Sequence, residues 1–331
     1  MPKNRALVLA SRPTAMPTPD NFRLIEQEVN APSEGQVLVR HLFLSVDPYM
    51  RGRMNAGRNY AEPQALDAVM QGGTVGEVVE SRNARFKAGD AVLGRGGWQL
   101  YSLTDGAELT KLARRSFPLS YYLGAVGMPG VTAWHGLNDI ITPKAGETIV
   151  VSAATGAVGS VVGQLARRAG ARTVGIAGGP EKCAYAVAEL GYAACIDHRA
   201  PDFAEQLHAA VPNRIDGLFE NVGGVPFQQC IARLNDFARV AICGLIASYN
   251  GAPTPLPDMR VILITRALIQ GFIVSDDMGY WPKALKELSD LADTGALKVR
   301  ETVSEGLESA PDAFIGLLSG RNFGKQIVKL A

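Results

Sequence analysis

The stretch TIVVSAATGAVGSVVGQLA, residues 148–166, decides the fold of this chain. It begins with β-branched residues, continues through a small, glycine-rich middle, and ends in the apolar spacing of a helix. That order predicts a strand, a tight turn and the start of a helix. Because the stretch carries no charge and contains Gly159-x-x-x-Gly163, a membrane-spanning helix is the alternative. The interrupting glycines favour the strand, turn and helix.

The turn itself reads Ala154-Thr-Gly156-Ala-Val-Gly159, which is the G-x-G-x-x-G pattern with alanine in first place. In this pattern Gly156 lets backbone N–H groups approach a pyrophosphate, and Gly159 lets the helix pack closely on the strand. The helix N-terminus adds about half a positive charge near the phosphates. We therefore expect dinucleotide binding, with a purely structural glycine turn as the alternative. The residues expected at the phosphates are Thr155, Gly156, Ala157, Val158 and Gly159.

The next predicted strand, residues 172–177, ends in Gly178-Gly179-Pro-Glu181-Lys182. An NAD-specific enzyme places an acidic residue at this point, on the 2′-hydroxyl of the adenine ribose. Here Gly179 leaves room at the strand end, and the Lys182 ammonium is suited to a 2′-phosphate. The segment therefore favours NADPH. The alternative is that Glu181 binds the ribose and Lys182 is solvated, which would favour NAD.

Length and composition bound the remaining possibilities. The chain has 331 residues, which at roughly 150 residues per domain indicates two domains. Lys and Arg total 33 against 32 for Asp and Glu, so no global field favours nucleic acid or an anionic membrane as partner. The four cysteines form no C-x-x-C pair, and the N-terminus lacks the apolar run of a secretory signal. We expect a cytoplasmic protein.

The pattern of predicted secondary structure changes near residue 128. Before it, short β-like runs are broken by Gly and Pro, at residues 6–10, 36–45, 73–80, 91–93 and 100–102. After it, apolar strands alternate with helical stretches, which predicts a parallel, doubly wound sheet covered on both faces. The last of these strands is expected near residues 270–275, at an edge of the sheet.

The C-terminal part predicts two helices and a strand. One helix spans residues 282–294, and another follows Ser309-Ala-Pro311 and stops near Gly320. The chain then ends in the alternating segment 324–330, which has no partner in a finished parallel sheet. We therefore expect this tail to return to the first, β-rich part.

Six motifs, in order, carry a family resemblance over the whole chain: residues 47–51 (DPYMR), 128–133 (MPGVTA), 153–160 (AATGAVGS), 220–224 (ENVGG), 244–250 (GLIASYN) and 322–328 (NFGKQIV). The chain resembles the zinc-independent medium-chain dehydrogenases/reductases, specifically the leukotriene B4 12-hydroxydehydrogenase/prostaglandin reductase family. Bacterial curcumin reductase and plant alkenal double-bond reductases belong to the same group. The resemblance implies a GroES-like catalytic domain of residues 1–127 and 300–331, interrupted by a Rossmann NADP-binding domain of residues 128–299.

The resemblance also implies an activity and an assembly. The activity is NADPH-dependent reduction of the carbon-carbon double bond of α,β-unsaturated ketones and aldehydes, such as alkenals, curcumin or 15-oxoprostaglandins, by hydride transfer to the β-carbon without a metal. The assembly is a homodimer formed through the cofactor domains, and the edge strand near residues 270–275 is the candidate for continuing the sheet. The alternatives are a quinone reductase of the same fold and a non-catalytic NADPH-binding regulatory protein.

By motif position, the resemblance assigns Lys182 to the 2′-phosphate and Asn221 to the nicotinamide-side ribose. One departure concerns Asp197-His198-Arg199, which stands where the family has a tyrosine after the third strand. His198 can still donate to a phosphate, but that contact becomes pH-sensitive. The residues implied at the nicotinamide half are Cys243, Gly244, Leu245, Ile246, Ser248, Tyr249, Phe272, Ile273, Val274 and Asn322.

Zinc enzymes share this architecture, so metal ligands must be sought. Zinc requires thiolates and imidazoles that converge on one point. No cysteine precedes Cys183, and the only histidines before it are His41 and His135. The G-H-E ligand motif is replaced by residues 71–74, QGGT. We therefore predict no metal site, and we read both histidines as structural.

Without a metal, the developing charge on an enone oxygen needs a hydrogen-bond donor. Tyr49, Tyr249 and the ribose hydroxyl of the cofactor are the candidates, with packing or turn-forming roles as the alternatives for the two tyrosines. Cys243 reads as a small hydrophobe rather than a nucleophile. The candidate substrate-pocket residues are Tyr49, Arg51, Tyr60, Trp98 and Met128, although anchoring of a turn is preferred for Arg51 and lone aromatics such as Trp98 are usually core.

Overall fold

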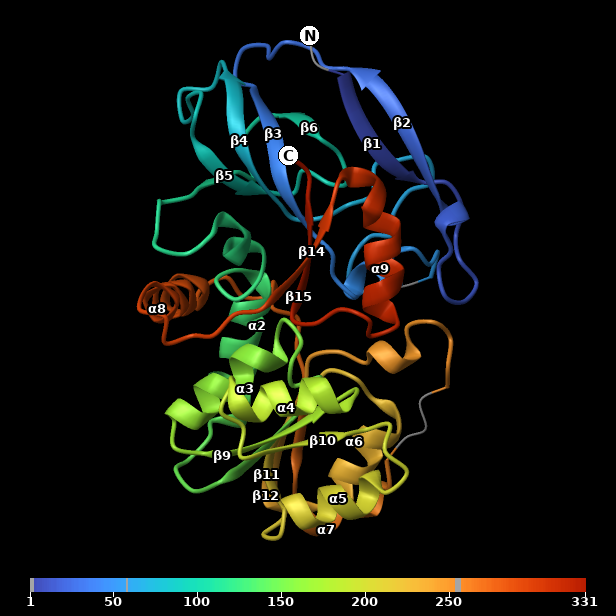
Figure 1. Ribbon diagram of the computed structural model, residues 1–331, viewed down its shortest axis with the longest axis vertical. Helices are drawn as coiled ribbons and strands as arrows, with labels where there is room; N and C mark the ends of the chain where they lie inside the picture. The colour runs from blue at the N-terminus through green and yellow to red at the C-terminus, as the bar shows by residue number, and fades with distance from the viewer. Residues whose placement is uncertain (1–2, 58, 254–256) are drawn as a thin grey trace. The chain divides into compact units, whose positions relative to one another are not determined.

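The computed structural model describes residues 3–57, 59–253 and 257–331. The chain divides into two compact units (Figure 1). Unit 1 contains Met1–Leu123 and Glu301–Ala331, and unit 2 contains Gly124–Arg300. Unit 1 is therefore built from both ends of the chain, and each unit is described by itself below.

Unit 2 contains a six-stranded sheet in the order β10-β9-β8-β11-β12-β13, and every neighbouring pair is parallel. Because β8 lies between β9 and β11, the connections leave it in opposite directions, as in a doubly wound Rossmann sheet. The predicted fold class is thus confirmed. The strands are β8 (Thr148–Ser152), β9 (Arg172–Ala177), β10 (Ala194–Asp197), β11 (Ile215–Glu220), β12 (Leu234–Ile242) and β13 (Leu268–Gly271).

Both faces of this sheet are buried. Along β8, Ile149 and Val151 pack in one apolar cluster whereas Val150 packs in the other. Side chains alternate between the two faces of a strand, so this split places a covered core on each side. The helices of the unit are α2 (Met128–His135), α3 (Gly159–Arg168), α4 (Pro180–Ala188), α5 (Phe203–Ala210), α6 (Gly224–Ile231), α7 (Met259–Thr265) and α8 (Trp281–Asp293), with a π-helical turn at Gly136–Ile141.

Two expectations for unit 2 are corrected. The membrane alternative for residues 148–166 is wrong, because the first five residues form strand β8 and the helix begins only at Gly159. Within the described ranges, no helix is long and apolar enough to span a bilayer. The predicted strand at 270–275 instead runs over Leu268–Gly271 as β13, since its ladder partner β12 ends at Ile242 opposite Gly271.

Unit 1 is a β structure completed by the C-terminal tail. Its larger sheet has the order β14-β15-β3-β4-β5-β7, with β6 also paired to β3, and β1 pairs separately with β2. The tail strand β15 lies antiparallel to β3, with Ile327 opposite Ser45, and parallel to β14. The strands are β1 (Lys3–Leu9), β2 (Phe22–Glu28), β3 (Val37–Ser45), β4 (Thr74–Ser81), β5 (Ala91–Gly94), β6 (Tyr101–Thr104), β7 (Thr110–Lys111), β14 (Glu301–Glu305) and β15 (Lys325–Lys329).

An aromatic core fixes the helices of unit 1. The ring of Trp98 stacks on Phe22 with centroids 5.4 Å apart and meets Phe314 edge-on at 5.9 Å. Phe314 belongs to α9 (Ala310–Leu318), and Met50 of α1 (Tyr49–Arg53) is buried in the same cluster. The short helix α1 is thus held by residues from both ends of the chain, and this packing sets the place of Tyr49.

Candidate cofactor and substrate sites

The glycine turn after β8 leaves no space for side chains. A Cβ added at Gly159 would lie 2.3 Å from the carbonyl oxygen of Ala153, and one at Gly156 would lie 3.2 Å from the same oxygen. At Gly163 the added atom would fall 2.1 Å from the ring of Tyr192, whose hydroxyl donates to the Gly159 carbonyl at 2.8 Å. The spacing of Gly159 and Gly163 therefore serves packing within the unit. The turn and the start of α3 form a cradle that fits a pyrophosphate.

A hydrogen-bond network joins the carboxyl ends of β8 and β11, the two central strands. The Ser152 hydroxyl donates to Glu220 Oε1 at 2.9 Å and accepts from the Asn221 N–H at 2.7 Å. The side-chain amide of Asn221 donates to the Ser152 carbonyl at 2.8 Å. Ligands of doubly wound sheets bind at this point, where the strand order reverses. The network thus fixes the backbone and side chain of Asn221, and the assignment of this residue to the ribose stays a prediction.

Glu220 is the buried centre of this network. Its Oε1 also accepts from the backbone N–H groups of Val222 and Gly223, at 2.6 and 2.7 Å. Burial raises the pKa of the Glu220 carboxyl, although these hydrogen bonds oppose the shift. Neither Glu220 nor Ser152 was assigned a role from the sequence. The signal that could have found them is a polar residue at the last position of each strand, directly after apolar residues.

Three basic side chains gather at the end of β9. A Cβ placed on Gly178 would lie 3.0 Å from His198 Nε2 and 3.2 Å from Arg199 Nε. Burial, followed by the nearby Arg199 charge, lowers the pKa of Lys182. The same two causes, in the same order, lower the pKa of His198. Positive charges that disfavour one another form a site that is stabilised by an anion.

Asp197 holds the backbone around this basic group through hydrogen bonds. Its Oδ1 accepts from the backbone N–H groups of Gly179 and Arg199, both at 2.9 Å. The carboxylate also raises the pKa of His198, but by less than burial and Arg199 lower it. Asp197 was noted in the sequence only as part of the Asp-His-Arg departure. Its position at the end of β10 holds the Gly179 turn and the Arg199 backbone together.

Tyr249 lies in the segment implied to line the nicotinamide. Its hydroxyl accepts from the Leu245 N–H at 3.4 Å, which leaves its own proton free to donate. Burial raises the pKa of Tyr249, so the phenol is neutral at physiological pH. The preceding residues are tied to β11, since Cys243 and Gly244 both donate backbone N–H groups to the Glu220 carbonyl. Burial raises the pKa of the Cys243 thiol to about 12, consistent with a small hydrophobe.

The segment after β13 is fixed by aromatic residues. Phe272 meets Phe219 edge-on at 6.3 Å and His135 at 5.4 Å. His135 stacks on Tyr280 at 4.1 Å, which gives it a structural explanation. The Val274 carbonyl accepts from the Tyr280 hydroxyl at 2.8 Å. Ile273 lies between Phe272 and Val274 and is held with them.

In unit 1, Tyr49 begins helix α1 directly after Asp47 and Pro48. Its half-buried ring lies 5.1 Å from the Arg53 guanidinium. Burial, and next the Asp47 charge, raise the pKa of Tyr49 well above its ordinary value. Like Tyr249, it is therefore a neutral phenol that can donate a hydrogen bond.

The other predicted pocket residues differ in their burial. Arg51 is 1% exposed and donates to Asn55 Oδ1 and the Ala15 carbonyl, both at 2.8 Å, so it anchors its surroundings and is not available to a substrate. Trp98 is 0% exposed in the aromatic core, so the prediction that it walls a pocket is wrong. Tyr60 is 55% exposed. Met128 begins α2 in unit 2, where its carbonyl accepts from Thr132.

Asn322, predicted at the nicotinamide, lies in unit 1 just before β15. Its side-chain amide donates to the Gly324 carbonyl at 2.7 Å. This bond fixes the segment that leads into the C-terminal strand.

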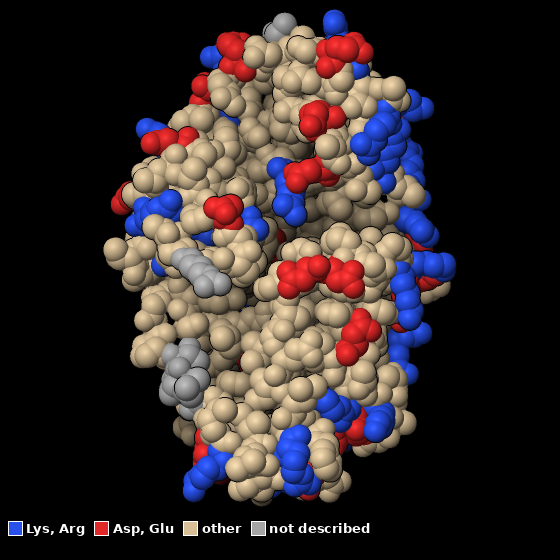
Figure 2. Space-filling view, turned by 180° about the vertical axis from the view of Figure 1, so that it is seen from behind, with Lys and Arg blue, Asp and Glu red and all other residues tan. Residues whose placement is uncertain are grey.

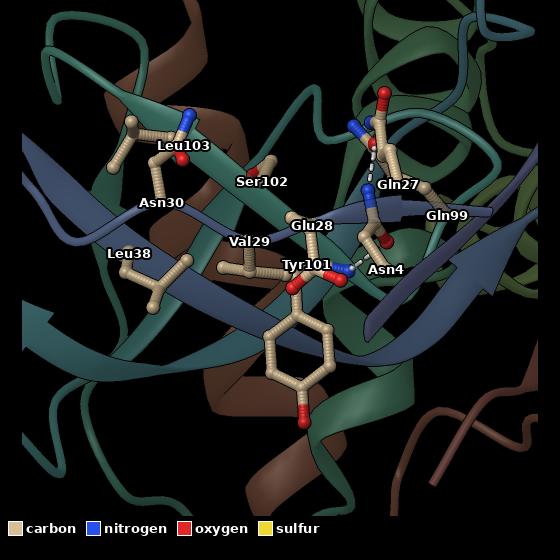
Figure 3. A pocket seen from close by; sticks show the side chains of 10 residues that line it. All are labelled: Asn4, Gln27, Glu28, Val29, Asn30, Leu38, Gln99, Tyr101, Ser102 and Leu103. Atoms are coloured by element: carbon tan, nitrogen blue, oxygen red, sulfur yellow. Dashed lines mark hydrogen bonds between the residues drawn. The ribbon is translucent and has the colours of Figure 1, made fainter. Parts of the chain in front are cut away.

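Two further features lie outside these sites. His41 is buried, which lowers its pKa to about 4, and its Nε2 lies 2.9 Å from the Ser102 hydroxyl. Among the residues that the structure describes, no group of three or more His, Cys, Asp and Glu side chains is arranged to hold a metal. A polar hollow of about 340 Å³ in unit 1 is lined by Asn4, Gln27, Glu28, Val29, Asn30, Leu38, Gln99, Tyr101, Ser102 and Leu103, none of which is a predicted site residue (Figure 3).

The chain is similar to known proteins over nearly its whole length. Two family models match, described as the N-terminal domain of oxidoreductase over residues 5–112 and as zinc-binding dehydrogenase over residues 157–290. The NADPH-dependent curcumin reductase of Escherichia coli (strain K12) is 48% identical over 99% of this chain and 97% of its own. Prostaglandin reductase 1 of Rattus norvegicus is 42% identical over 95% of both chains.

A solved structure is similar throughout. CurA from Vibrio vulnificus, in complex with NADPH, superposes with a TM-score of 0.95 at 48% identity, covering 99% of each chain. The doubly wound sheet with its glycine turn, and the β unit completed by the C-terminal strand, are the two parts of a medium-chain dehydrogenase/reductase. The chain belongs to the zinc-independent leukotriene B4 12-hydroxydehydrogenase/prostaglandin reductase family within that superfamily.

Proposed function

We propose that this chain is an NADPH-dependent reductase of the carbon-carbon double bond of α,β-unsaturated ketones and aldehydes. The names of its relatives, a curcumin reductase and a prostaglandin reductase, support the substrate class. The observation within the chain that carries the cofactor assignment is the basic group of Lys182, His198 and Arg199 around Gly178. An NAD enzyme would present a carboxylate to the ribose there.

The residues of unit 2 fit the parts of NADPH in chain order. The turn from Thr155 to Gly159 and the start of α3 fit the pyrophosphate, and Lys182 with His198 fits the 2′-phosphate. Asn221 fits the nicotinamide-side ribose, since Ser152 holds its amide. The nicotinamide, when bound, supplies the hydride. Glu181, the carboxylate that would instead serve NAD, lies near enough to Lys182 to raise its pKa.

The chain's own contribution to the reaction is hydrogen bonding and positioning. As hydride reaches the β-carbon, negative charge moves to the carbonyl oxygen, and a fixed donor there lowers the barrier. Tyr249 and Tyr49 are both neutral phenols able to donate, because burial raises their pKa values. The proton that completes the product is added at the α-carbon. We assign Tyr249 first, since the Leu245 N–H already occupies one lone pair of its oxygen and orients it.

We further assign the substrate to the discontinuous domain of residues 1–127 and 300–331, and NADP to residues 128–299. Tyr49 and Tyr60 of unit 1 are retained as candidate substrate contacts, because neither side chain is fully buried. The predicted role of Met128, in unit 2, stays a prediction. The four cysteines Cys183, Cys195, Cys230 and Cys243 are free, which fits a reducing cytoplasm. Figure 2 shows acidic and basic side chains together on the visible face, in keeping with a net charge of +1 and a small-molecule substrate.

We also propose a homodimer formed through unit 2. Helix α7 exposes Met259, Leu263 and Ile264 by 62, 78 and 66%, and Leu268 of β13 is 53% exposed. Among the strands of the described residues, β13 pairs only with β12 and lies at the edge of the sheet. An exposed apolar helix beside an open strand edge is costly in water and fits a second copy of the same surface. Gel filtration should give twice 35.2 kDa, and Leu263→Asp should give the monomer.

One assay separates the proposed function from its alternatives. NADPH absorbance is followed with an enal, a medium-chain enone, a curcuminoid and a quinone, and the products are identified. Consumption with the first three, with saturated carbonyl products, is the expected result. Consumption with the quinone alone would indicate a quinone reductase, and binding of NADPH without any consumption would indicate a regulatory protein.

A further inference from the structure

The first residue of the C-terminal strand is a buried lysine. Lys325 is 3% exposed, and its ammonium group donates to the carbonyls of Val46 and Gln326 at 2.9 and 2.8 Å. Its third partner is Asp47 Oδ1 at 3.2 Å, and the other Asp47 oxygen accepts from the Ser45 hydroxyl. Three acceptors surround three ammonium protons, so the buried charge is fully hydrogen-bonded.

A second carboxyl group faces the same ammonium. Glu301 lies directly opposite Lys325 in the β14–β15 ladder. Its Oε2 accepts from the Ser120 hydroxyl at 2.7 Å, while its Oε1 is buried without a hydrogen-bond partner. Burial lowers the pKa of Lys325, and Asp47 and then Glu301 oppose that shift. The two carboxyl groups together offset part of the cost of burying this ammonium in the interior of unit 1.

Stability alone does not explain such a pair. A buried ion pair gains little over well-packed apolar residues of similar volume, because both charges must leave water. The pair does fix the two backbone segments that carry it, because a buried charge is stable only next to its hydrogen-bond partners. The turn that contains Asp47 leads within two residues to Tyr49, and the segment that ends at Lys325 contains Asn322 three residues earlier. Both segments belong to the proposed site.

We propose that Asp47 and Lys325 are a positioning pair, whose buried contact sets the Tyr49 hydroxyl and the Asn322 segment in the geometry of the reaction without touching the substrate. This inference rests on the proposed function. The inference also gives the C-terminal strand a role in the site. Strand β15 brings the Lys325 ammonium to Asp47, two residues before Tyr49. A displacement of about 1 Å in a reacting geometry can lower a rate by about a hundredfold.

The test uses the full-length protein with Lys325→Met, Asp47→Asn and the double variant. Lys329→Met is the matched control, because Lys329 lies on the same strand and makes an exposed ion pair with Glu305 at 3.5 Å. We expect kcat for an enone to fall at least about tenfold in both single variants, with KM for NADPH changed less than about twofold. In the double variant the melting temperature should recover while kcat stays low. The control should match the wild type.

A cycle with Tyr49→Phe shows whether the pair acts through the tyrosine. In that background, Lys325→Met should lower kcat by less than a further twofold, because the hydroxyl that it positions is already gone. If Lys325→Met lowers kcat by the same factor with and without Tyr49→Phe, the two effects are independent and the proposal is overturned. So would a double variant whose kcat recovers together with its stability, since that would show a purely structural role.

A readout without activity separates this inference from the proposed function. In protein labelled with fluorotyrosine, the ¹⁹F line absent from Tyr49→Phe belongs to Tyr49. That line should shift in Lys325→Met and in the double variant and stay in place in Lys329→Met. An unmoved line overturns the positioning pair, even if the enzyme reduces enones. If the line shifts but the protein reduces no enone, the coupling between Lys325 and Tyr49 is supported and the proposed function is rejected.

Discussion

The basic group at Gly178 makes a quantitative prediction about Lys182. A charge-assisted hydrogen bond contributes about 1.5–3 kcal/mol, and Lys182 is half-buried and shares the site with His198 and Arg199. Because Arg199 and His198 stay beside the phosphate and retain part of the attraction, the loss in Lys182→Ala should lie at the lower end of that range. A loss of about 1.4 kcal/mol corresponds to a tenfold weaker affinity. The variant should therefore bind NADPH about tenfold more weakly and NADH within about twofold of the wild type.

Titration of cofactor fluorescence gives both dissociation constants in one experiment. Lys286→Ala is the matched control, since it removes the same charge from an exposed position on α8, where Lys286 pairs with Asp290. It should leave both affinities unchanged. If Lys182→Ala weakens NADPH and NADH equally, the lysine does not contact the 2′-phosphate. If the variant binds NADH more weakly and NADPH unchanged, the better interpretation is that Glu181 binds the adenine ribose and that the cofactor is NAD.

Three further outcomes follow from the same geometry. Tyr249→Phe should lower kcat at least about tenfold with little change in KM, and an unchanged kcat would move the donor role to Tyr49 or the ribose. Gly159→Ala should lower both the melting temperature and NADPH affinity, since its Cβ would lie 2.3 Å from a carbonyl oxygen; normal values for both would contradict the tight turn. Because burial and Arg199 lower the pKa of His198, the histidine is neutral near pH 7 and gains charge as pH falls. The preference for NADPH over NADH should therefore increase toward acid pH, measured as the ratio of KM values, and His198→Gln should remove that trend.

Local patterns predicted the cofactor sheet well, because each of its motifs is short and continuous. The residues that make β8, the glycine turn and α3 follow one another directly in the sequence, so their structure is determined by neighbours. In contrast, β2 was missed, since most of its side chains face solvent and show no alternation. The end of β13 depends on where β12 stops, which the sequence of β13 itself does not contain.

The site residues divide in the same way. Roles could be proposed for Gly156 and Gly159 because both belong to one local motif, and for Asn221 because of the family resemblance. Trp98 could not be placed, because its burial depends on Phe22 and Phe314 from distant segments.

The partnership of Asp47 and Lys325 was equally invisible in the sequence. A C-terminal strand had to cross back to β3 before the two charges could meet. Contacts between residues so far apart in the sequence depend on tertiary packing, and no motif of fixed spacing indicates them.

The central claim is hydride transfer from NADPH to the β-carbon of an enone, and isotope labelling tests it most directly. The protein is incubated with an enone and NADPH deuterated at the transferred position of the nicotinamide, and the product is examined by mass spectrometry and NMR. We predict a saturated carbonyl compound with one deuterium on its β-carbon and one NADPH consumed per molecule. An allylic alcohol with deuterium on the former carbonyl carbon, or no deuterium in any product, would contradict it.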